Sequence, residues 1–99
     1  MSMDARQPTG GTSLTAGTVA VNFSAATLLN AKHGVITVEA GAVRWWDDGQ
    51  TPTTTAGQLA SVGDVISYLE EEDMAVALSK FKAVRTGATS GTLVASFYG

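Results

Sequence analysis

Apolar and polar residues alternate over short segments through most of the chain, a pattern typical of strands that bury one face. The alternation is clearest near the end, where Leu93, Ala95 and Phe97 share one face and Val94 begins the other. The pattern predicts strands at residues 14–23, 35–39, 42–46, 65–69, 81–85 and 92–98. Residues 26–29 are expected to form a further short strand or a turn.

The segments between these strands are rich in residues that favour turns. Asp48-Gly49 is a dipeptide that tolerates the positive φ of a tight turn. Residues 30–34 and 86–91 are turn clusters, and residues 50–57 form a polar loop. The strands are therefore expected to be short and closely connected.

Residues 65–69 fit either a strand or the first turns of a helix. A helix capped by Asp64 would place Glu72 and Asp73 on its apolar face, which is unfavourable. A strand is therefore favoured at residues 65–69, followed by a helical turn near residues 73–78.

About seven short strands with no internal repeat predict an all-β fold, a small antiparallel β-sandwich or barrel. In the first strand, the set ending in Val19, Val21 and Phe23 is the more apolar and is expected to face inward. Residues 13–99 would form this single domain. Residues 1–12 offer little that a core could bury, which predicts a flexible N-terminal arm, either disordered or ordered by a neighbouring subunit.

The amino-acid composition argues against several classes of function. The 99 residues carry a net charge of -3 with only 15% charged residues, which argues against nucleic acid as a partner. No run of about 18 apolar residues exists, so no membrane span is expected, and the first residues lack the apolar stretch of a secretory signal. The chain has no cysteine, which excludes disulfides, thiolate metal sites and a cysteine nucleophile.

The candidate catalytic and ligand-binding motifs are weak. His33 lies in a predicted turn without an accompanying nucleophile, and is expected to be an exposed loop histidine. The acidic pair at residues 47–48 and the run of four acids at residues 70–73 are expected to be solvated, because consecutive acids point in different directions. Gly10-Gly11 and residues 87–91 lack the lysine and helix of a phosphate loop. We therefore expect no enzyme activity, no cofactor and no metal.

Two adjacent tryptophans are the most informative feature. Trp45 and Trp46 would point to opposite faces of a strand, so a one-sided sheet can bury only one of them deeply. The other would contact another subunit, lie under a loop of its own chain or offer a sugar-stacking platform. As interface residues we predict this pair together with Arg44, Phe97 and Tyr98.

A series of short motifs follows residue 38, in the order AVRWWDDG at 42–49, TPT at 51–53, Gly57, Gly63-Asp64, KFKAVR at 80–85 and GTLVASFY at 91–98. With these motifs, the stretch from Val38 to Tyr98 resembles small structural proteins of tailed bacteriophages. The individual motifs are common, and only their order is distinctive. The resemblance implies a virion component and brings no catalytic residues with it.

These observations together predict a non-enzymatic virion structural protein, a capsid decoration or cement protein. Its expected partners are other copies of itself, in a homotrimer or another small ring, and the major capsid protein. It would be assembled in the host cytoplasm and localised in the virion. The alternatives are a neck, tail or fibre-base component and, from another class, a carbohydrate-binding β-sandwich module.

Overall fold

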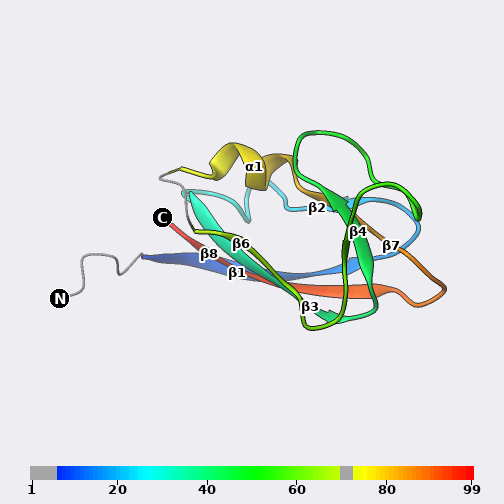
Figure 1. Cartoon of the computed structure of the whole chain (residues 1–99). Helices are drawn as coiled ribbons and strands as arrows, with labels where there is room; N and C mark the ends of the chain where they lie inside the picture. Colours follow the sequence, from blue (N-terminus) through cyan, green and yellow to red (C-terminus); the bar gives the residue numbers. More distant parts are fainter. Residues whose placement is uncertain (1–6, 70–72) are drawn as a thin grey trace.

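The computed structural model describes residues 7–69 and 73–99, which form two antiparallel four-stranded sheets (Figure 1). The long sheet contains, in spatial order, β1 (Pro8–Ala16), β8 (Gly91–Tyr98), β3 (His33–Ala40) and β6 (Val65–Tyr68). The short sheet contains β2 (Val21–Asn22), β7 (Lys82–Arg85), β4 (Val43–Trp46) and β5 (Gln58–Ala60). One short helix, α1 (Ala75–Lys80), is described, and it is far too short to span a membrane. The all-β expectation is confirmed.

The two sheets are the two layers of one four-stranded sheet that folds over on itself. Each strand of the long sheet continues through a short corner into the strand that occupies the same position in the short sheet. Neighbouring corners are also hydrogen-bonded, with Arg85 N donating to Gly17 O (2.9 Å), Thr86 N to Ala42 O (3.2 Å) and Gly63 N to Val38 O (2.8 Å). Backbone pairing is therefore maintained where the chain changes sheet, so few polar groups are left unsatisfied at the fold line.

Glycines allow two of these corners to cross closely. Gly41 has a φ of 63°, and a Cβ there would lie 2.5 Å from Ser90 O. A Cβ at Gly91 would overlap Val43 Cγ1. A methyl group is excluded at Gly41 by both backbone conformation and space, and at Gly91 by space alone.

The core between the layers is organised around a row of four aromatic rings, in which Phe97 meets Phe23 edge-on and the other contacts are stacked. Phe23 lies between Phe97 and Phe81, with ring centroids 5.0 Å and 5.2 Å away, and Trp45 stacks on Phe81 at 5.6 Å. Figure 1 shows α1 on the same side of the long sheet as the short sheet, where it covers the part that the short sheet does not reach. Leu78 of α1 is fully buried there.

The predicted N-terminal arm was wrong for residues 8–12, which form the first half of β1. These residues pair with β8, as in Thr12 opposite Ala95, and Gly and Thr residues suffice because the backbone makes the hydrogen bonds. Residues 1–6 lie outside the described residues.

The predicted strand at residues 14–23 is interrupted at the corner between β1 and β2. This break shifts the alternation, so Ala16 is buried before the corner and Phe23 after it, whereas Val19, expected to face inward, is 78% exposed. His33 was expected in an exposed loop, but it begins β3 and is buried.

The strand interpretation of residues 65–69 is confirmed by β6, and α1 overlaps the helical turn expected near residues 73–78. Glu72, which counted against a helix at residues 65–69, lies outside the described residues. β5 was not predicted as a strand, because its three residues are too few for a periodic pattern.

Candidate interaction surface

The outer face of the long sheet carries no charged residue at its centre. The strand register places Ser13, Val94, Thr37 and Val65 in one row across all four strands. The neighbouring row is Gly11, Ser96, Val35 and Ser67. Thr15 and Thr92 extend the face at one end. We call these ten residues the uncharged face.

The uncharged face is open to solvent. Val65 is 57% exposed and Val94 is 41% exposed, although valine is a residue that folding usually buries. α1 and the short sheet both lie on the opposite side of the long sheet (Figure 1). In the four strands of the long sheet, only Glu39 has a formal charge at neutral pH, and it lies beside the bulge at the end of β3.

The outer face of the short sheet is different, because a loop covers it. Arg44 Nη1 donates a hydrogen bond to Gly57 O (3.1 Å), and Pro52 of the same loop is buried. Val84, the cross-strand partner of Arg44, is only 3% exposed. Gly57 adopts a φ of 128°, and a Cβ there would lie 3.2 Å from Arg44 Cβ. Arg44, predicted as an interface residue, therefore anchors residues 50–57 within its own chain.

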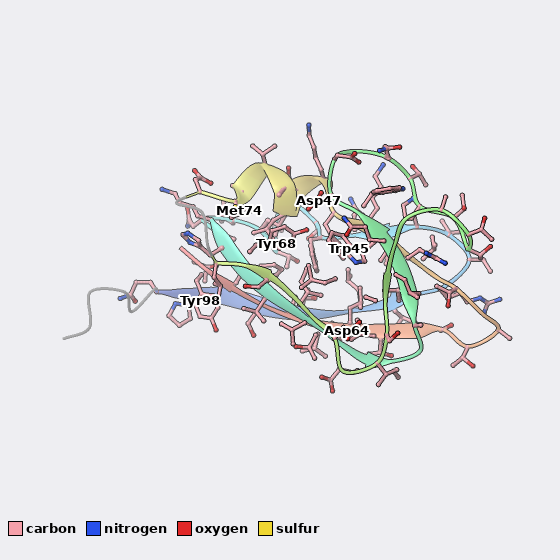
Figure 2. All side chains as sticks on the ribbon, in the orientation of Figure 1. Trp45, Asp47, Asp64, Tyr68, Met74 and Tyr98 are labelled. Atoms are coloured by element: carbon pink, nitrogen blue, oxygen red, sulfur yellow. The ribbon has the colours of Figure 1, made fainter. Side chains whose placement is uncertain are left out.

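Trp45 and Trp46 have opposite orientations but similar, intermediate burial. Trp45 points to the core, stacks on Phe81 and is labelled beside the short sheet in Figure 2. Trp46 points to the other side, where Lys82 is its cross-strand neighbour. Trp45 is the one that packs against the core, but neither tryptophan is deeply buried, since both are of intermediate exposure.

The predicted interface residues do not form one surface. Phe97 is fully buried in the core, so its assignment to an interface was wrong. Tyr98 follows it on the opposite side of β8 and is half-buried at the end of the long sheet (Figure 2). β8 is also not an edge strand, because it pairs with β1 on one side and β3 on the other. The final strand is thus central to the fold.

The ionisable groups near these surfaces have structural partners. Tyr68 Oη donates to Asp47 Oδ2 (2.7 Å), and burial followed by this hydrogen bond raises the pKa of Tyr68 above its usual value. Hydrogen bonds from the side chain and backbone of Gln50 lower the pKa of Asp48. Among residues 7–69 and 73–99, no three His, Cys, Asp or Glu residues are grouped in a way that could hold a metal ion.

The sequence carries a signal for the uncharged face that no single strand reveals. The ten outward positions at the centre of β1, β8, β3 and β6 are occupied by Gly, Ser, Thr and Val and lack the Lys and Glu that exposed strand positions commonly carry, whereas Glu39 lies beyond them at the end of β3. This absence can be recognised only when the strands are placed in register, because each strand alone supplies two or three such positions.

Comparison with known proteins assigns no family. No protein-family model matches the chain, no curated protein matches it, and no solved structure matches it. A virion role is therefore a proposal that rests on the residues and the geometry alone.

Proposed function

We propose that this chain is a non-enzymatic structural protein of a tailed-phage particle, and that it attaches to the capsid through the uncharged face. The open, uncharged centre of the long sheet is the observation that carries this proposal. Binding through such a face removes no formal charge from water, so little desolvation cost opposes the contact. The order of motifs from residue 42 to residue 98 supports the assignment to phage particles.

The size of the face fits attachment to a repetitive surface. Ten outward residues, spaced about 4.8 Å between strands and about 6.8 Å along each strand, offer roughly 330 Å² of contact area. Roughly 650 Å² buried in total is below the usual size of a specific contact. A single copy would therefore bind weakly, and the capsid would be covered because the same binding site recurs many times on its lattice.

The proposal is tested by two measurements on the phage that encodes the chain. Mass spectrometry of density-purified particles should detect the chain, and purified chain should sediment with heads that lack it. Because the contact is uncharged, raising the salt concentration should leave binding nearly unchanged. Absence from the particles together with no binding to heads would contradict the proposal, and recovery on isolated tails would favour a neck, tail or fibre-base component.

A carbohydrate-binding module is the second candidate, and Trp46 is the residue that favours it. Its ring is partly exposed on the outer side of the short sheet, beside Lys82. Trp45 is less suited to a platform, because one side of its ring stacks on Phe81. Glycan-array binding that disappears in Trp46→Ala and survives in Trp45→Phe would favour the module over the virion protein.

A further inference from the structure

The folded-over sheet has four edge strands, and one of them is unusual. β6 has four residues, β5 has three and β2 has two, whereas β1 has nine. Within the described part of the chain, β1 pairs as a strand with β8 alone, so its other edge offers unpaired backbone N–H and C=O groups. Long edges of this kind invite pairing with another strand.

β1 also lacks the features that protect exposed edges. Natural edge strands are typically short, charged, bulged or interrupted by proline. β1 has no charged residue, and its proline and its bulge both lie at its beginning, between Pro8 and Gly10. Residues 11–16 are therefore a regular, unprotected edge. β6, by contrast, is short and directly follows Asp64.

We propose that β1 pairs antiparallel with β1 of a second copy about a two-fold axis, joining the two long sheets into one continuous eight-stranded sheet. This inference is independent of the virion role. A two-fold axis places the same strand on both sides of the contact, so the nine residues of each copy match in length. β1 brings no like charges together, although each chain is acidic overall.

Pairing between β1 and β6 of the next copy is the competing arrangement. It would leave more than half of β1 uncovered, because β6 offers only four residues. It would also be a head-to-tail contact that builds rings or open fibres. The two-fold pair covers both long edges at once, and it places two uncharged faces side by side on the same surface.

The direct test combines sedimentation with amide hydrogen exchange of the full chain, measured from micromolar to near-millimolar concentration. We expect a monomer–dimer equilibrium, with alternate amides of residues 11–16 becoming protected as dimer forms and β6 amides unchanged. Protection of both β1 and β6 would show the head-to-tail arrangement and overturn the proposal. A strict monomer, or a dimer in which β1 amides still exchange rapidly, would also overturn it.

A pair of matched variants separates edge pairing from other contacts. Ser13 and Ser67 are both exposed serines on edge strands, in β1 and β6 respectively. At low salt, Ser13→Lys should raise the dimer dissociation constant several-fold, because symmetry brings two lysines close together, whereas Ser67→Lys should leave it unchanged. Equal effects of the two variants would contradict the proposal. If β1 is protected only when phage heads are added, the occupant is a capsid strand and not a second copy.

Discussion

The hydroxyl of Tyr68 donates a 2.7 Å hydrogen bond to Asp47 Oδ2, joining β6 of the long sheet to the residue that follows β4 in the short sheet. The Tyr68 ring is buried, whereas Asp47 is half-buried and can still contact water. This bond holds the two layers together at a position where no backbone ladder connects them. Burial raises the pKa of Tyr68 most, because the ionised hydroxyl would lose its hydration, and the hydrogen bond to Asp47 and the negative charge of Asp47 raise it further.

Tyr68 should make stability fall in alkaline solution. The folded-state pKa is raised, so above about pH 10 the unfolded chain releases the tyrosine proton while the folded chain retains it. The free energy of unfolding should therefore decrease as pH rises past that point. Tyr68→Phe should flatten this decrease and should cost about 0.5–1.5 kcal/mol at neutral pH through the lost hydrogen bond.

Urea unfolding at a series of pH values between neutral and alkaline provides the measurement. Tyr98→Phe is the control, because its ring lies on the other side of the long sheet and makes no bond to Asp47. An alkaline slope that is the same in Tyr68→Phe and in the unmodified protein would show that Tyr68 does not contribute as described.

The two tryptophans should differ in their contribution to stability. Trp45→Ala removes a ring that stacks on Phe81 and packs against the core, and should cost about 2–3 kcal/mol, less than a fully buried aromatic. Trp46→Ala should cost about 1 kcal/mol or less, because its ring is absent from the core cluster. Chemical denaturation of the two variants measures the free energy of unfolding. Equal decreases in this free energy would contradict the opposite orientations of the two tryptophans.

The corner crossing should not tolerate a side chain. Gly91→Ala places a methyl group against Val43 and should destabilise the protein by about 1–3 kcal/mol through overpacking. Gly87→Ala is the matched control, since nothing lies within 4 Å of its Cβ position, and its effect should stay within about 0.5 kcal/mol. Thermal unfolding of both variants tests the folded-over geometry, which a neutral Gly91→Ala would contradict.

Residues 8–12 should contribute to stability, whereas residues 1–6 should not. Deleting residues 1–12 removes the first half of β1 and exposes the edge of β8, so the unfolding midpoint should fall by several degrees. Deleting residues 1–6 leaves β1 whole and serves as the control. Equal midpoints for the two truncated chains would mean that residues 8–12 contribute nothing to the sheet.

Strands in which apolar and polar side chains alternate could be predicted from the sequence. Segments held mainly by backbone hydrogen bonds could not. β8 was predicted with its faces correct, because Leu93, Ala95 and Phe97 alternate with outward residues over the whole strand. The beginning of β1 could not be recognised, since Gly10 and Gly11 give no periodic signal and the pairing with β8 is made by backbone groups. Long-range register decides such pairings, and local sequence does not encode it.

The candidate site was predicted least well, for a related reason. The sequence drew attention to large aromatic residues, yet Phe97 is core and Trp45 completes the aromatic stack. The surface proposed here consists of small residues contributed by four strands that are far apart in the chain. Its one conspicuous property, the absence of charge, becomes apparent only in the folded sheet.

Attachment through the uncharged face is tested most directly by placing a charge on it. Val94 and Val65 lie on this face, whereas Val76 of α1 and Val19 of the corner are valines elsewhere that are even more exposed. Because all four are exposed, substitution by glutamate should leave folding nearly intact at each position.

The measurement is co-sedimentation of the four glutamate variants with purified phage heads that lack the chain, at low and high salt. The account predicts that Val94→Glu and Val65→Glu lose binding, whereas Val76→Glu and Val19→Glu bind like the unmodified protein at both salt concentrations. Unchanged binding of Val94→Glu, or an equal loss in Val76→Glu, would contradict it.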